Sequence, residues 1–344
     1  MQITGSTQSR CLATFCWLLL VGAVAAPLPA GPNAIQSATN SPWKRIVLIG
    51  ASATAGFTVT EPLGGTNTPL YGLSRYVEAA LTVPHEPVKN LGNAYLFLQP
   101  QMFAQLQLTQ ALTNQPTLVL GVDFLFWFCY GEGSTDAERL ERFEHGLKLL
   151  EKIECPLVVG DLPDASATVN VMLRPDQMPS LQAIAAANLR LKAWAANRSQ
   201  VIVLGLSEFM RNAVANRAIS VHDYVLPDGA TRQLLQDDKL HASPAGCAVL
   251  AFALLDAVST TRTGIHLDEF RRDPKEILRR VLEAAKATPA RTTRTNNPPA
   301  EIKRSLSGHD LPAGASGIFA ALLESAAPLQ WARCPKHWSL TKSI

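Results

Sequence analysis

A serine in a turn of small residues is the first feature of this sequence that could do chemistry. Ser52 lies in the run GASATAG, residues 50–56, directly after the apolar segment 46–49. Small neighbours let a substrate carbonyl approach a serine Oγ, and backbone N–H groups at such a turn can hold a developing oxyanion. The alternative is an ordinary strand-to-helix turn whose serine caps the helix. A phosphate-binding loop is not indicated, because the GxGxxG pattern and the P-loop lysine are both missing.

An aspartate and a histidine three residues apart form the second such feature. Asp238 and His241 lie in the run DKLHASPAG, residues 238–246, just before an apolar segment of helical period. On a loop that leads into a helix, this spacing can place the carboxylate against Nδ1 and leave Nε2 free as a base. The alternative is a capping aspartate beside an exposed histidine. His222 and Asp223 are a rival pair, but their polar stretch has no such junction, which favours His241.

Short apolar runs alternate with longer segments of helical period, and this alternation predicts the elements that position these side chains. Strands are expected at 46–49, around Val88, and at 117–120, 156–159 and 201–204, and helices at 72–82, 99–113, 136–153, 179–197 and 244–259. Apolar strands without polar alternation indicate a parallel sheet covered on both faces. The predicted fold is α/β, a three-layer, doubly wound and mostly parallel sheet of about five strands, with its chemistry at the carboxyl ends of the strands.

Together the two segments resemble the SGNH/GDSL hydrolase family, over about residues 44–262. Residues 50–56 resemble its GDSxTxG nucleophile block, and residues 238–241 resemble its DxxH block. The resemblance implies the flavodoxin-like SGNH fold, in which Ser52, His241 and Asp238 cleave carboxylic esters through an acyl-enzyme without a metal or organic cofactor. It also implies oxyanion or substrate-binding roles for Gly92, in the run VKNLG, and Asp123, in the run LGVD.

Three departures from the family pattern bear on activity. Ala51 replaces the usual aspartate beside the nucleophile, Tyr95 stands where a glycine is expected, and Asp123 occupies the place of the oxyanion asparagine. An ionised carboxylate cannot donate a hydrogen bond. Asp123 is therefore expected to be protonated by burial among its aromatic neighbours, to point elsewhere, or to lower activity. These departures keep a non-catalytic exported binding protein as an alternative function, and an acyltransferase to a sugar hydroxyl would use the same triad.

The aromatic run FLFWFCY, residues 124–130, permits two interpretations. It could line an acyl or aromatic pocket beside the serine. Alternatively, its rings are core and interface packing, which such runs more often are.

The ends of the chain predict export. Arg10 precedes an apolar run at 11–26 that ends in small residues, which is typical of a signal peptide, here 1–25, and of a secreted or periplasmic protein. An uncleaved N-terminal anchor is the alternative and the one membrane contact expected. A flexible linker is predicted at 26–42, the hydrolase-like domain at 43–262, and a C-terminal helix with a largely disordered tail at 263–344.

Composition limits the partners. The formal net charge is only +3 and charged residues make up 17% of the chain, so no basic field indicates nucleic acid. A small-molecule, lipid or carbohydrate ester is the expected substrate. Four cysteines follow the predicted signal peptide, and they are expected either to pair or to be buried as free thiols: Cys129, Cys155, Cys247 and Cys334.

Overall fold

Five short parallel strands form the central sheet of the computed structural model, which describes residues 41–62, 64–131 and 135–287. The sheet order is β2-β1-β3-β4-β5, and all neighbours in it are parallel. This is the flavodoxin-like order of a doubly wound sheet, so the predicted fold class is confirmed. The strands are β1 (Ile46–Leu48), β2 (Lys89–Asn90), β3 (Leu118–Gly121), β4 (Leu157–Gly160) and β5 (Val201–Leu204).

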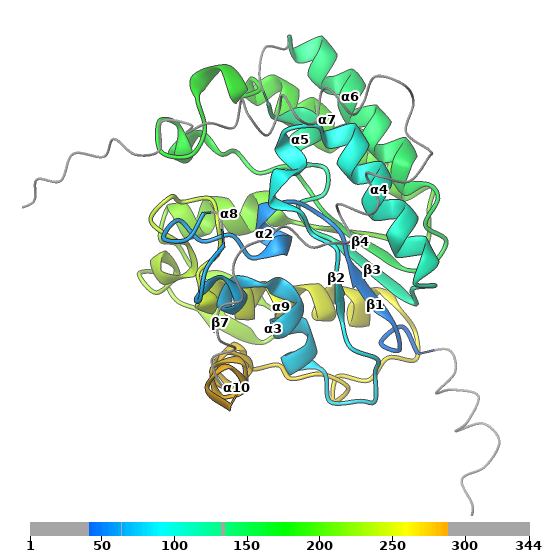
Figure 1. The fold of residues 1–344 in the computed structure, drawn as a ribbon, viewed down its shortest axis with the longest axis vertical. Coiled ribbons are helices and arrows are strands. Elements are labelled where there is room, and N and C mark those ends of the chain that lie inside the picture. The colour runs from blue at the N-terminus through cyan, green and yellow to red at the C-terminus, as the bar shows by residue number, and fades with distance from the viewer. Residues whose placement is uncertain (1–40, 63, 132–134, 288–344) are drawn as a thin grey trace, which may run out of the picture. The chain divides into compact units, whose positions relative to one another are not determined.

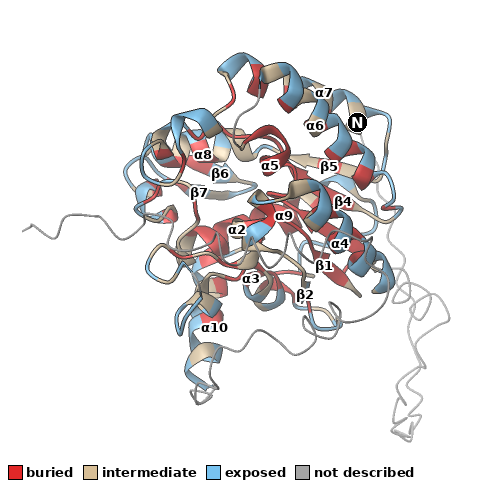
Figure 2. Cartoon of the chain, turned by 45° about the horizontal axis from the view of Figure 1, so that its top comes forward, coloured by how far each residue is buried: buried red, intermediate tan, exposed pale blue. Residues whose placement is uncertain are grey.

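Helices cover both faces of this sheet (Figure 1). One face carries α4 (Pro100–Thr113), α5 (Phe126–Cys129), α6 (Asp136–Leu150) and α7 (Leu181–Ala196), and the other carries α3 (Leu73–Ala80), α9 (Pro244–Thr261) and α10 (Pro274–Ala287). Side chains alternate between the two layers, because successive strand residues point to opposite faces. In β1, Val47 packs in the first layer, whereas Ile46 and Leu48 pack in the second. Figure 2 shows the buried residues concentrated along the sheet and on the inner sides of the helices.

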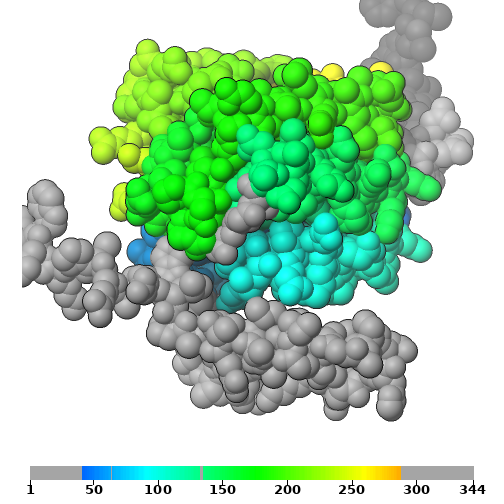
Figure 3. All heavy atoms as spheres, turned by 90° about the horizontal axis from the view of Figure 1, so that it is seen from above, coloured from blue at the N-terminus to red at the C-terminus, as the bar shows by residue number. Residues whose placement is uncertain are grey.

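Local capping explains where the longer helices begin. Thr135 and Glu138 form a capping box at the start of α6, and Ser180 accepts the amide of Ala183 at the start of α7. Ser243 caps α9, where Pro244 occupies the first turn without losing a hydrogen bond. The helices predicted from the sequence therefore form within a few residues of their expected ends. Figure 3 shows α4, in cyan, beside the green surface that contains α6 and α7.

Several elements were not predicted. They are α8 (Leu206–Val214) and an antiparallel hairpin of β6 (Ile219–Val221) and β7 (Tyr224–Leu226). Single-turn helices make up the rest: α2 (Ser52–Ala55), α5 (Phe126–Cys129), η1 (Thr68–Tyr71), η2 (Ala94–Phe97), η3 (Ser166–Thr168), η4 (Pro175–Gln177) and η5 (Thr231–Leu234).

Helix α9 is long and apolar enough to cross a membrane by composition alone. About two thirds of it, 67%, is buried against the rest of the domain, as in the core helix of a globular fold.

The packed domain extends past its predicted end at 262. Phe270, Ile277 and Val281 are almost fully buried in the second core layer, and Thr82 donates its amide to the Glu269 carbonyl. This segment was predicted to lie outside the domain because it is rich in charged residues, although apolar residues recur in it at helical spacing. The corrected domain therefore includes the segment up to α10. The predicted signal peptide, nearly all of the linker and the tail from 288 onward lie outside the described residues.

Candidate active site

The structure brings Ser52, His241 and Asp238 into one hydrogen-bonded line. Ser52 begins α2 directly after β1, and its Oγ lies 2.8 Å from His241 Nε2. His241 Nδ1 lies 2.6 Å from Asp238 Oδ2, and both residues are buried, at 3% and 1% exposure. These side chains are the ones singled out in the sequence, and they meet at the carboxyl edge of the sheet.

The protonation pattern follows from the partners of Asp238. Its Oδ1 accepts the backbone N–H groups of Leu240 and His241, each at 3.0 Å. Burial raises the pKa of Asp238, but the hydrogen bonds and charge of His241 together with these amides outweigh it and hold the pKa below its ordinary value. An ionised carboxylate accepts only, so Nδ1 carries the proton. Nε2 is then left to accept the proton of the Ser52 hydroxyl.

Gln236 and Phe57 connect the loop that carries Asp238 and His241, called the histidine loop, to the segment that follows Ser52. Gln236 donates Nε2 to the carbonyls of Phe57 and Ala242, and its Oε1 accepts the Val59 amide. The Phe57 ring packs against the His241 imidazole with centroids 4.3 Å apart. These contacts restrain the loop that carries His241 and one face of its imidazole.

Asp123 faces the turn that carries Ser52, residues 51–54, called the nucleophile turn, and binds it by hydrogen bonds. Its Oδ1 accepts the Ala51 amide at 3.0 Å and the Thr54 hydroxyl at 2.5 Å, and its Oδ2 accepts the amides of Ala53 at 2.9 Å and Thr54 at 3.3 Å. Burial raises the pKa of Asp123 above its ordinary range, and these hydrogen bonds offset only part of that rise. The Asp123 carboxylate thus points at the turn 51–54, as one of the three expectations had it, and its pKa shifts in the direction of another, protonation by burial.

Gly50 is the residue that permits this contact. Its φ of +150° is strained for other residues, and a Cβ at this position would overlap Asp123 Oδ1. Gln107 of α4 binds the same glycine twice, because its Oε1 accepts the Gly50 amide at 2.9 Å and its Nε2 donates to the Gly50 carbonyl at 2.8 Å. The turn that carries Ser52 is therefore held from β3 and from α4.

Gly92 packs against this turn, but its amide is already engaged. A Cβ on Gly92 would lie 2.7 Å from the Ala55 nitrogen, which explains the need for glycine. Its N–H donates to Asn90 Oδ1 at 2.9 Å, and Asn90 Nδ2 donates to the Thr54 carbonyl. The structure thus gives Gly92 a packing role and occupies the donor that the predicted oxyanion role requires.

Sequence reasoning missed Gln107 and Gln236. Both are amides that satisfy backbone groups far away in the chain, and neither lies in a motif. The sequence does not set Gln107 apart from the three other glutamines of α4, but the structure buries it to 3% exposure. Such a buried amide needs partners.

The rival histidine lies elsewhere. His222 is in the β6–β7 hairpin, where its Nδ1 lies 3.2 Å from Asp256 Oδ1 of α9. The hydrogen bond to Ser52 comes from His241. In the described ranges, no three His, Cys, Asp or Glu side chains gather as a metal site would require. Cys129, Cys155 and Cys247 are free thiols, and Cys334 lies outside the described residues.

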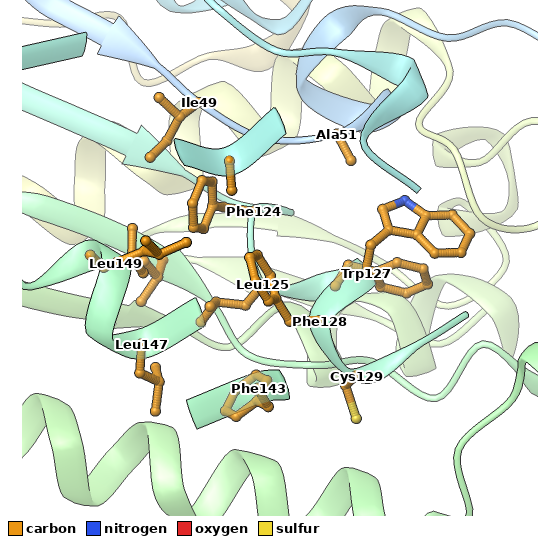
Figure 4. Packing of buried hydrophobic residues seen from close by; sticks show 14 of the residues in the cluster. Ile49, Ala51, Phe124, Leu125, Trp127, Phe128, Cys129, Phe143, Leu147 and Leu149 are labelled. Carbon is orange, nitrogen blue, oxygen red and sulfur yellow. The ribbon is translucent and has the colours of Figure 1, made fainter. Parts of the chain in front are cut away.

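The aromatic run 124–130 divides between the two roles that the sequence allowed. Figure 4 shows Leu125 and Phe128 on the side of Phe143 and Leu147 of α6, while Trp127 lies toward Ala51. Phe126 and Trp127 line a cavity that also borders Ser52 and His241. The other rings of the run are core packing.

The chain thus combines a doubly wound parallel sheet with a Ser-His-Asp line at the carboxyl edge of that sheet. No family model and no curated protein matches the chain. Similar solved structures include a lipase/acylhydrolase from Enterococcus faecalis, with 18% identity and a TM-score of 0.43, covering 67% of this chain and 98% of the other. A GDSL-like lipase from Bacteroides thetaiotaomicron has 14% identity and a TM-score of 0.40, covering 67% of this chain and 96% of its own.

An acetylxylan esterase from Geobacillus stearothermophilus has 15% identity and a TM-score of 0.41, covering 62% of this chain and 94% of its own. The chemistry of this chain follows from the side chains described above.

Proposed function

We propose that this protein hydrolyses carboxylic esters through an acyl-enzyme on Ser52. The observation that carries the proposal is the continuous line from Ser52 Oγ to His241 Nε2, at 2.8 Å, and from His241 Nδ1 to Asp238, at 2.6 Å. A nucleophile, a base and a group that orients the base need this order and these distances.

The reaction proceeds in two half-reactions. In the first, Ser52 Oγ attacks the ester carbonyl, His241 Nε2 takes the hydroxyl proton and then gives it to the departing alcohol. In the second, water attacks the acyl-enzyme while His241 again takes a proton and returns it to Ser52 Oγ, which releases the carboxylic acid. Asp238 stays ionised and stabilises the imidazolium in both steps.

The Ser52 amide is the oxyanion donor best supported within the turn. Three of the four amides at 51–54 donate to Asp123. The fourth, that of Ser52, stands in the first position of α2, where helix N–H groups have no intrahelical partner, and it makes no hydrogen bond to the described residues. Since Asp123 occupies its neighbours, this amide remains to face the carbonyl oxygen.

Hydrolysis of p-nitrophenyl acetate tests the proposal. Ser52→Ala and His241→Ala should each lose nearly all turnover, because triad members act as a unit and losses of about a millionfold are known for such changes. His222→Ala is the matched control and should keep turnover close to that of the wild type. A folded wild-type protein with no hydrolysis would support the binding-protein alternative. Loss of activity in His222→Ala with full activity in His241→Ala would assign the base elsewhere.

We also infer that the chain is exported and that its substrate is a small-molecule, lipid or carbohydrate ester. Support for export is the apolar run 11–26 with its small residues at 23–25. Expression in a host with a secretory pathway, followed by N-terminal sequencing of the secreted protein, should give Ala26 as the first residue. Retention of the intact N-terminus in the membrane fraction would indicate an anchor instead.

A further inference from the structure

An apolar cavity of about 60 Å³ opens directly beside Ser52 and His241. Its walls come from distant parts of the chain, namely the segment after β3, helix α8, the histidine loop and α9. The side chains that shape it include Val122, Trp127, Leu206, Phe209, Met210 and Leu250.

The polarity of these walls restricts what the cavity can hold. Its polar side chains are Ser52, His241, Asp123 and the indole of Trp127. Both oxygens of Asp123 are already bound by the nucleophile turn. Besides the catalytic pair, a hydroxylated or charged group entering the cavity would meet only the Trp127 indole as a polar partner, so losing its water would carry a free-energy cost. The cavity suits an aliphatic group.

Its depth limits the length of that group. Val122, Met210 and Leu250 are 3%, 6% and 6% exposed, whereas Leu206 and Phe209 are only partly buried and stand nearer the solvent. A cavity of about 60 Å³ holds on the order of five water molecules, or an aliphatic chain of about four to six carbons.

The order of the reaction decides which half of the ester enters. The alcohol has to leave and water has to arrive between the two half-reactions, while the acyl group stays attached to Ser52 Oγ throughout. A cavity that ends on buried side chains would retain the alcohol and obstruct water. The acyl chain is the half that such a cavity can hold without slowing the cycle.

We propose that this cavity binds the acyl chain of the substrate, so that the protein prefers esters of short aliphatic acids of about four to six carbons. This inference rests on the ester hydrolysis proposed above. Met210 forms the adjustable end of the cavity, because a methionine side chain is flexible and its truncation opens space rather than removing a polar contact.

A series of p-nitrophenyl esters from acetate through butyrate, hexanoate and octanoate to laurate tests the inference with the full-length protein. Each buried methylene should raise kcat/KM by about fourfold, so butyrate, with two more methylenes, should exceed acetate by about fifteenfold. Activity should then fall at octanoate, where the chain meets Met210. Met210→Ala should raise the octanoate-to-acetate ratio by about fifteenfold, since space for about two methylene groups is added.

Two further variants keep the test decisive. Leu206→Phe adds volume at a half-buried wall of the cavity and should lower the butyrate-to-acetate ratio. Met172→Ala removes a partly buried methionine that does not line the cavity, and should leave the chain-length profile as in the wild type.

The outcomes separate the two proposals. Hydrolysis of acetate with a flat chain-length profile, unmoved by Met210→Ala and Leu206→Phe, would overturn the acyl cavity and leave the hydrolase proposal standing. A flat acyl profile combined with an optimum among alkyl acetates that Met210→Ala shifts would place the alcohol in the cavity. No hydrolysis of any ester by the folded protein would overturn the proposed function and this inference with it.

Discussion

Replacing Asp123 by asparagine should slow this protein, although it restores the residue that the family pattern has at that place. The Asp123 carboxylate accepts three backbone N–H groups and the Thr54 hydroxyl, and it uses both oxygens to do so. Asparagine keeps one acceptor oxygen. If that oxygen faces Ala53 and Thr54, the Thr54 hydroxyl can accept from the new NH₂ group, but the buried Ala51 amide faces a donor.

The magnitude follows from that one amide. A buried N–H without a partner costs about 1–3 kcal/mol. Because Ala51 precedes Ser52, relaxation of the turn should move Oγ relative to His241, and kcat should fall by about 10-fold to 100-fold. We expect a similar loss of about 1–3 kcal/mol in the free energy of unfolding measured with urea.

Asp161→Asn is the matched control for this experiment. Asp161 is also a buried carboxylate just after a strand, and it accepts the amide and the hydroxyl of Ser207, both at 2.6 Å. Its replacement should lower stability and leave turnover of p-nitrophenyl acetate close to the wild-type value. An Asp123→Asn variant as fast as the wild type, or faster, would refute the holding role and favour an oxyanion role for this position.

Three further predictions follow from the same contacts. Gln107→Met preserves side-chain volume but leaves the Gly50 amide without a partner, while the Gly50 carbonyl still accepts from the Asn93 amide. The free energy of unfolding in urea should therefore fall by about 1–3 kcal/mol. An unchanged urea midpoint would contradict the two-point contact. Removal of residues 288–344 should leave hydrolysis of a soluble ester intact. Removal from 264 onward should lower the free energy of unfolding by several kcal/mol, since burial of Phe270, Ile277 and Val281, worth about 1.5–3 kcal/mol each, is lost. Equal stability of the two truncated proteins would contradict the packing described for α10. Because its pKa is lowered, the Asp238 carboxylate adds stability above about pH 4, and this stability disappears as the pH falls through the lowered pKa. Acid unfolding of Asp238→Asn should therefore depend less on pH than that of the wild type. The raised pKa of Asp123 acts with the opposite sign and remains in both proteins.

The sequence was sufficient for the architecture because its strands are continuous apolar runs and its helices carry caps and helical periods. The parallel orientation of the strands followed from the alternation of these elements, since parallel strands need crossover helices. The end of the domain was harder to predict. In α10, Ile277 and Val281 are buried beneath a charged surface, and composition averages the two sides of such a helix together.

In the candidate site, too, some residues could be predicted from the sequence and others could not. Ser52, Asp238 and His241 lie in two local patterns, and the two patterns together, at opposite ends of the α/β domain, indicated the triad. The direction of the Asp123 carboxylate depends on its contact with the turn 51–54, where Ala53 lies 70 residues away along the chain. The amides of Gln107 and Gln236 likewise act across long separations, of 57 residues for Gln107 and 179 for Gln236 with Phe57. No pattern within a single segment contains such pairings.

Covalent labelling of the native protein by a fluorophosphonate probe tests the central claim most directly. Such a probe reacts with a serine whose hydroxyl is activated by a base, and mass spectrometry of the digested protein identifies the labelled residue. We predict one labelled peptide in the wild type, modified at Ser52, and no labelling there in Ser52→Ala or His241→Ala. Absence of label from folded wild-type protein, or a label on another serine that persists in Ser52→Ala, would contradict the assignment of Ser52 as the nucleophile.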